Sequence, residues 1–157
     1  MLKPLFNPND DQWVMMVGRY MLNMGAMEAA ARQLIVLINE TDSIPIFNDS
    51  LAPKIGYLKK RFPRDDLPKH KTAMNTFNVA AKHVKFRNII AHNTLAFREG
   101  LDGSLDIQGI MNMAPDDKKI LYELISLEEL SGRVNESAIV VRQLLEMQSE
   151  LSNQAQS

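Results

Sequence analysis

Three long stretches of this chain repeat their apolar residues about every 3.6 positions, which is the period of one helix face. They cover about residues 10–40, 69–92 and 127–151. A shorter helix is expected from Ala52 to Phe62, because Pro53 suits its first turn. Helices with one apolar face must cover each other, so we expect a helical bundle.

The apolar positions predict which face of each long helix is buried. The first helix is expected to bury Trp13, Val17, Tyr20, Met21, Met24, Ala31, Ile35 and Ile38. The third is expected to bury a narrow stripe of Met74, Phe77, Ala81 and Val84. The last is expected to bury Leu130, Val134, Ala138, Val141, Leu144, Leu145 and Leu151.

The pattern changes between the third helix and the last one. Short runs there read better as strands than as helix: Leu95–Phe97, Ser104–Gln108 and Lys119–Ile125. Ser126, followed three residues later by Glu129, forms a capping box that opens the last helix. We therefore predict a mainly α fold, an antiparallel helical bundle with a small antiparallel β-meander before the C-terminal helix.

Length and composition are those of a soluble globular protein. A length of 157 residues fits one domain, expected over residues 1–151, with residues 152–157 as a frayed polar tail. No cysteine is present, which excludes disulfides, thiolate metal sites and cysteine nucleophiles. Three histidines without a carboxylate cluster predict no metal and no other cofactor. Polar residues interrupt the first helix and no signal pattern precedes it, so we expect a cytoplasmic protein without a membrane span.

Charge is strongly segregated along the chain. Residues 54–98 contain eleven Lys and Arg but only two acidic residues, which gives this span a formal charge of +9. The whole chain carries −1, so the remainder carries −10. Two interpretations stay open: a chance segregation with both surfaces simply solvated, or a basic surface that attracts a polyanion.

The basic span contains the most distinctive polar group of the chain, the sequence RNIIAH at residues 87–92. Arg87 offers a planar fork of donors that fits phosphate. His92 has an imidazole that titrates near neutrality. Helical projection extends the apolar stripe of this helix to Asn88 and His92, with Arg87 on its edge. Candidate site residues are therefore Arg87, Asn88 and His92.

The same helix end has apolar residues on its other side, because Phe86 and Ile90 project away from that stripe. A helix end that is apolar nearly all round needs covering on more than one side. A partner subunit would supply the cover, and a symmetric homodimer would bring two copies of the polar trio together.

Glu28 projects into the apolar stripe of the first helix, where a carboxylate is costly unless it is paired. Arg32 is one expected partner, because a Glu-then-Arg pair four residues apart is favourable. Arg87 or His92 from the third helix is the other. Glu28 is thus either half of a structural ion pair or part of the candidate site. The remaining histidines, His83 and His70, are expected to face solvent.

An arginine, a polar residue and a histidine at this spacing resemble the R-x4-6-H motif of the HEPN superfamily (higher eukaryotes and prokaryotes nucleotide-binding domains). About residues 10–150 resemble its stand-alone bacterial members, because the motif closes a long helix and precedes short strands and a capped last helix. The resemblance implies a HEPN-like domain that dimerises through the motif region. It also implies a metal-independent endoribonuclease related to toxins or phage defence.

On this hypothesis RNA is cleaved by attack of its 2′-OH in a composite site at the homodimer interface. His92 would transfer protons, and Arg87 would hold the scissile phosphate. Asn88 and Glu28 would orient these groups. The residues expected to bind RNA are Lys59, Lys60, Arg61, Arg64 and Lys85. Two alternatives stay open: a non-catalytic module for nucleotide binding, protein interaction or dimerisation, and a domain that works only with an antitoxin or regulatory protein.

Overall fold

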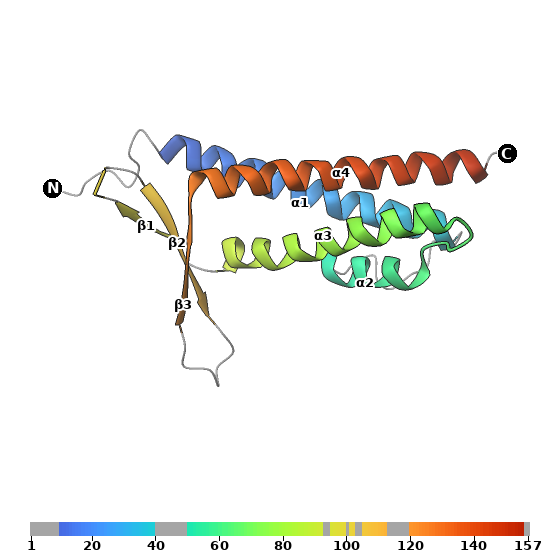
Figure 1. Cartoon of the computed structure of the whole chain (residues 1–157), viewed down its shortest axis with the longest axis horizontal. Coiled ribbons are helices and arrows are strands. Elements are labelled where there is room, and N and C mark those ends of the chain that lie inside the picture. Colours follow the sequence, from blue (N-terminus) through green and yellow to red (C-terminus); the bar gives the residue numbers. More distant parts are fainter. Residues whose placement is uncertain are drawn as a thin grey trace.

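The computed structural model describes residues 10–39, 50–92, 95–99, 101–102, 105–112 and 120–155. Within the strands it describes the side chain of Ile125 alone, and the side chains of Asp10, Ile89 and His92 also lie outside the description. The elements are α1 (Asp10–Asn39), α2 (Leu51–Arg61), α3 (Leu67–His92), β1 (Leu95–Glu99), β2 (Leu105–Asn112), β3 (Ile120–Ile125) and α4 (Leu127–Ala155) (Figure 1).

The helices form a bundle, as predicted, but their directions differ from the prediction. Helix α1 packs chiefly on α4, and Figure 1 shows these two long helices running in the same direction. Helix α3 runs the opposite way, and α2 packs against both α1 and α3. The expected antiparallel order is therefore wrong for α1 and α4. The reason is topological: α3 returns the chain to the end where α1 begins, so α4 starts from that end as well.

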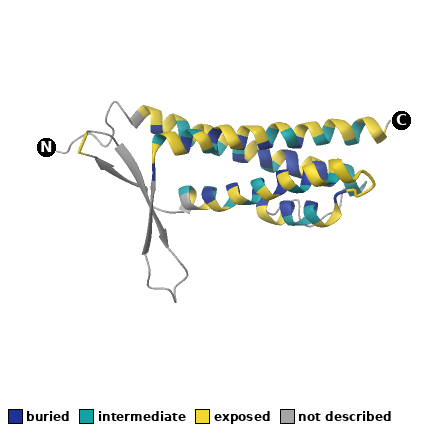
Figure 2. Ribbon diagram, in the orientation of Figure 1, coloured by how far each residue is buried: buried dark blue, intermediate teal, exposed yellow. Residues whose placement is uncertain are grey.

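The described core is helical. It is built around large side chains with no exposed surface: Tyr20, Met27, Leu34, Ile35, Leu58, Phe77 and Leu144. Figure 2 shows that the buried residues gather on the sides of the helices that face one another. Outside the helices, the described core receives only Phe62, directly after α2, and Ile125, at the end of β3.

The predicted fold class needs a correction where it adds a β-meander to the helical bundle. A bundle with a β-meander built into it was expected, whereas the part of the chain described with its side chains is a helical bundle. Backbone pairing joins β1 to β2 and β2 to β3, both antiparallel, with Leu95 opposite Gly109 and Ile107 opposite Ile125. The strands satisfy their backbone groups by this pairing, while the helices already cover each other's apolar faces.

Helix α4 begins as expected and ends later. Ser126 Oγ accepts a hydrogen bond from the Glu129 backbone N–H at 3.1 Å, so the predicted N-cap is confirmed. The helix continues to Ala155, four residues beyond its predicted end at Leu151. Its buried residues are Leu130, Val134, Ser137, Val140 and Leu144. Two predicted core positions, Ala138 and Leu145, are exposed instead.

Helix α1 is, by length and composition, long and apolar enough to cross a membrane; no other helix among the described residues is. The core helix of a soluble protein meets the same criterion. Its side chains Tyr20, Met27 and Leu34 have no exposed surface in the bundle. The inward face of α1 is thus occupied by contacts with the other helices.

Candidate functional site

One pocket brings together three of the four residues expected to be catalytic. Glu28 from α1 and Arg87 and Asn88 from α3 line a cavity of about 400 Å³. The rest of the wall comes from Met21, Met24, Gly25, Ser50, Leu51, Ala52 and Val84. The cavity therefore lies where α1, α3 and the start of α2 meet. The spacing of residues within a single helix does not predict it.

Arg87 and Asn88 are neighbours on the rim of this pocket. Arg87 Nη1 donates a hydrogen bond to Asn88 Oδ1 at 3.2 Å. Arg87 is half-buried, while Asn88 is exposed. Asn88 was expected on the inward stripe of its helix, and that placement is wrong. An exposed amide beside a half-buried guanidinium presents donors and an acceptor to a ligand in the pocket.

The inward face of α3 is rotated relative to the prediction. Its buried residues are Ala73, Thr76, Phe77, Ala80, His83 and Phe86. The predicted stripe residues Met74, Ala81 and Val84 are only partly buried. Apolar residues surround much of this helix, so helical periodicity alone selects the wrong face. The polar residues Thr76 and His83 lie on the face of α3 that is buried in the structure.

Glu28 is paired with a residue that the sequence argument did not consider. Lys54 Nζ lies 3.2 Å from Glu28 Oε1, and the side chains are 1% and 45% exposed, respectively. Arg32, Arg87 or His92 had been expected as the partner. Lys54 is buried because it shares the inward face of α2 with Leu51, Ile55 and Leu58. This spacing of three and four residues was visible in the sequence.

The start of α2 forms part of the pocket lining. Ser50 precedes the helix in an extended conformation, and its side chain makes no capping hydrogen bond. The next residues, Leu51 and Ala52, line the pocket and belong to the helix turn whose N–H groups have no partner within the helix. A helix N-terminus carries partial positive charge, so it reinforces Arg87 in favouring an anion.

His92 is the fourth predicted catalytic residue. It is the last residue of α3, five positions after Arg87. A helix rises about 1.5 Å per residue, so their backbones are about 7.5 Å apart along the axis. The His92 side chain lies outside the described residues, and the placement of its imidazole stays a prediction.

The residues expected to bind RNA do not share this pocket. Lys59, Lys60 and Arg61 form the last turn of α2, and Arg64 is exposed in the turn that follows. The pocket lies at the first turn of α2, about 15 Å away at the rise of a helix. Lys85 is exposed on α3 and projects about 160° away from Arg87 around the helix. Within one protomer these residues belong to separate surfaces.

A second cavity, of about 340 Å³, lies between the α2–α3 turn and the end of α4. Phe62, Met147 and Leu151 supply its apolar wall. Its acidic residues are Asp65, Asp66, Glu146 and Glu150, and Lys69 Nζ lies 3.3 Å from Glu150 Oε2. None of the predicted site residues lines this cavity.

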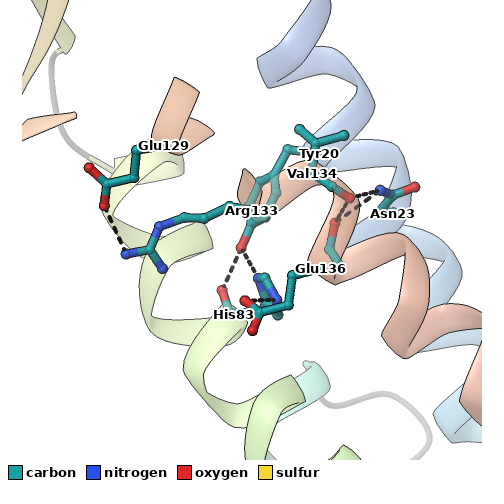
Figure 3. A network of polar contacts seen from close by, with 8 residues as sticks. Tyr20, Asn23, His83, Glu129, Arg133, Val134 and Glu136 are labelled. Atoms are coloured by element: carbon teal, nitrogen blue, oxygen red, sulfur yellow. Dashed lines mark hydrogen bonds and ion pairs between the residues drawn. The ribbon is translucent and has the colours of Figure 1, made fainter. Parts of the chain in front are cut away.

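His83 is the polar residue that the sequence argument misjudged most. It was expected to face solvent, but its side chain is 1% exposed. Tyr20 Oη lies 3.1 Å from His83 Nδ1 and donates to the His83 backbone oxygen at 3.0 Å. On the other side of the ring, Nε2 lies 3.1 Å from Glu136 Oε2. Figure 3 shows the imidazole between Tyr20 of α1 and Glu136 of α4.

Burial dominates the titration of this cluster. Removal of the imidazole from water lowers the pKa of His83 below 6.5; the nearby Glu136 carboxylate opposes this shift, and the Arg133 guanidinium adds to it. Burial also raises the pKa of Tyr20. Nε2 lies within ion-pair distance of Glu136 Oε2 but has no hydrogen-bond partner among the described residues. Burial therefore favours the neutral form of the His83 ring.

Among the residues that the structure describes, no three His, Cys, Asp or Glu side chains lie close enough to hold a metal ion. The described pocket residues offer anion binding by Arg87 and hydrogen bonding by Asn88.

The chain was compared with protein families, curated proteins and solved structures. No protein-family model, no curated protein and no solved structure matches the chain.

Proposed function

We propose that the chain is a metal-independent endoribonuclease of the HEPN type, related to toxins or phage defence and active as a cytoplasmic homodimer. One observation carries the proposal: Glu28, Arg87 and Asn88 come from two helices and line the same pocket. Arg87 and Asn88 were predicted as site residues, and Glu28 was predicted either in this site or in a structural ion pair.

The pocket suits a phosphodiester group. Arg87 can donate two parallel hydrogen bonds to phosphate oxygens, and the first turn of α2 adds backbone donors. Positive charge at this position stabilises the phosphorane that forms during cleavage. The Glu28 carboxylate would repel phosphate, but Lys54 Nζ at 3.2 Å offsets its charge. Glu28 is thereby left to orient Arg87 or the substrate.

Proton transfer is assigned to His92. Cleavage without metal needs a base for the 2′-OH and an acid for the leaving 5′-oxygen. No histidine is among the described residues that line the pocket. His92 therefore completes the site, from the same chain or from the partner in a symmetric dimer. The products would carry 2′,3′-cyclic phosphate ends.

The test compares four proteins: wild type, Arg87→Ala, His92→Ala and the control Arg142→Ala, which alters an exposed arginine of α4. Each is incubated with end-labelled single-stranded and hairpin RNA, with and without EDTA. Wild type and Arg142→Ala should cut RNA in EDTA, while Arg87→Ala and His92→Ala should be slower by about 100-fold or more. Cleavage that stops with EDTA, or that persists unchanged in His92→Ala, would falsify the assignment.

The second candidate is a non-catalytic module that binds a nucleotide or a partner through the same pocket. It is favoured by the described lining, which offers anion-binding and hydrogen-bonding groups but no histidine among the described residues. It predicts that no sample cuts RNA, while Arg87→Ala weakens binding of a mononucleotide. Light scattering of wild type separates the two further, because the nuclease proposal requires a dimer at the concentration where RNA is cut.

A further inference from the structure

The contacts around His83 require more hydrogen atoms than the neutral residues carry. Three close contacts are present: Tyr20 Oη to His83 Nδ1, Tyr20 Oη to the His83 backbone oxygen, and His83 Nε2 to Glu136 Oε2. Neutral histidine brings one ring hydrogen and tyrosine brings one hydroxyl hydrogen. With the ring hydrogen on Nδ1, both Tyr20 contacts are hydrogen bonds. Nε2 then faces Glu136 without a hydrogen, in agreement with its lack of a hydrogen-bond partner.

Protonation of the ring supplies the missing hydrogen. An imidazolium donates from both nitrogens, so the contact to Glu136 becomes a charge-assisted hydrogen bond. This bond joins α3 to α4, while Tyr20 continues to join α3 to α1. Three groups face the ring: Tyr20 from α1, and Glu136 and Arg133 from α4. Glu136 favours the charged ring, and Arg133 and burial oppose it.

The contacts between Tyr20 and His83 stabilise the turn of α3 that carries Arg87. In an α-helix the carbonyl of residue 83 accepts the N–H of residue 87, so the Tyr20 hydroxyl binds the carbonyl that anchors Arg87. Phe86 is fixed on two sides: its ring meets Tyr20 edge-on with centroids 5.2 Å apart, and the Arg133 guanidinium lies 4.1 Å from its centroid. Met21, the residue that follows Tyr20 in α1, lines the pocket.

We propose that Tyr20 and His83 are positioning residues for the Arg87 pocket, and that uptake of a proton by His83 strengthens the binding of phosphate there. This inference rests on the proposed function in one respect, the role of Arg87 as phosphate ligand. Protonation ties the Arg87 turn to α4 and adds positive charge one helical turn from Arg87. By linkage, phosphate bound at Arg87 must favour the protonated ring to the same extent.

The first test follows the His83 ring and the backbone amides of Arg87 and Asn88 by NMR between pH 8 and pH 4.5. Wild type should show one shared titration midpoint. In Glu136→Gln this midpoint should fall for all three signals together, because the carboxylate that favours the charged ring is lost. Glu136 is half-exposed, so this variant keeps the fold. The control Glu146→Gln, also on α4, should titrate as wild type does.

Tyr20→Phe removes the hydroxyl and keeps the ring that packs on Phe86. The Arg87 amide should then exchange its hydrogen about fivefold faster, as expected for the loss of one hydrogen bond. The control Tyr57→Phe removes a hydroxyl that donates to Asn39 Oδ1 at 2.6 Å, and it should leave the Arg87 amide unchanged. Amides of residues 87 and 88 that titrate independently of the His83 ring overturn the coupling. A His83 ring that stays neutral until the helices unfold also overturns the proposed coupling.

The last measurement separates this inference from the proposed function. Inorganic phosphate should raise the His83 midpoint in wild type but not in Arg87→Ala. Shared midpoints that do not respond to phosphate would support the positioning role and contradict Arg87 as the phosphate ligand. A phosphate response in wild type without shared midpoints would support the ligand and contradict the positioning role.

Discussion

Lys54 and Glu28 form an ion pair whose two ends lie in different surroundings. The ammonium is 1% exposed and the carboxylate 45% exposed, with 3.2 Å between Nζ and Oε1. A buried ammonium without a polar partner is costly, whereas a half-exposed carboxylate stays in contact with water. The pair joins α1 to α2 beside the pocket. Breaking it affects mainly Lys54, because Lys54 is the buried partner.

Glu28→Gln should lower the free energy of unfolding by about 2 kcal/mol. The expected loss is that of a hydrogen bond to a charged group, and it stays below the cost of breaking a fully buried pair because Glu28 is partly solvated. Urea denaturation measures it. Glu146→Gln changes an exposed glutamate of α4 and serves as the control. Equal stability of the two variants would show that the pair contributes nothing to the fold.

Leu34→Ala should destabilise the bundle by about 3 to 5 kcal/mol, because it leaves a cavity where the side chain has no exposed surface. The matched control is Leu22→Ala in the same helix, where the side chain is 75% exposed. That change should cost less than about 0.5 kcal/mol. The midpoints of urea denaturation compare the two, and a similar loss in both would contradict the burial described for α1.

Asn23→Ala should weaken the contact between α1 and α4. Asn23 Nδ2 donates to the Val134 backbone oxygen at 3.1 Å and to Ser137 Oγ at 2.9 Å. Loss of these partly buried hydrogen bonds should cost about 1 to 2 kcal/mol. Asn75→Ala, at an exposed position of α3, should leave thermal stability unchanged or slightly raised, because alanine favours helix. A thermal midpoint that falls equally in both variants would assign the effect to something other than this contact.

His83 should make stability depend on pH. Burial lowers its pKa below 6.5, so near that pH the unfolded chain takes up a proton more readily than the folded chain does. The folded state is therefore fully favoured above pH 6.5 and loses stability as the pH falls from there towards the folded pKa. Urea denaturation at several pH values should show this loss in wild type and in the control His70→Gln. It should be smaller in His83→Gln, and an identical pH profile in all three proteins would contradict the pKa shift.

The fold was predictable where a local pattern determines the structure. The Ser126 cap forms because its hydroxyl meets an N–H three residues away, within one turn. The positions of the four helices follow from apolar spacing in the same way. The direction of α4 relative to α1 was not predictable, because it depends on how the intervening segments return the chain.

The candidate site was predictable only in part. Arg87, Asn88 and Glu28 were identified by residue type and do line one pocket. The roles of Lys54 and His83 were missed, since each is a polar residue on an inward face whose partner comes from another helix. Glu28 pairs with Lys54 and Tyr20 contacts His83, and neither contact leaves a signal in the spacing of one segment.

The parallel packing of α1 and α4 also has a consequence for the order in which the protein can fold. Helix α1 is synthesised well before its main partner α4, and Asn23 and Ser137 are 114 positions apart. Contacts so distant in sequence form late and slow the folding of a domain. Throughout synthesis the inward face of α1 has no α4 to cover it, so the nascent chain presents a long apolar surface that a chaperone can hold.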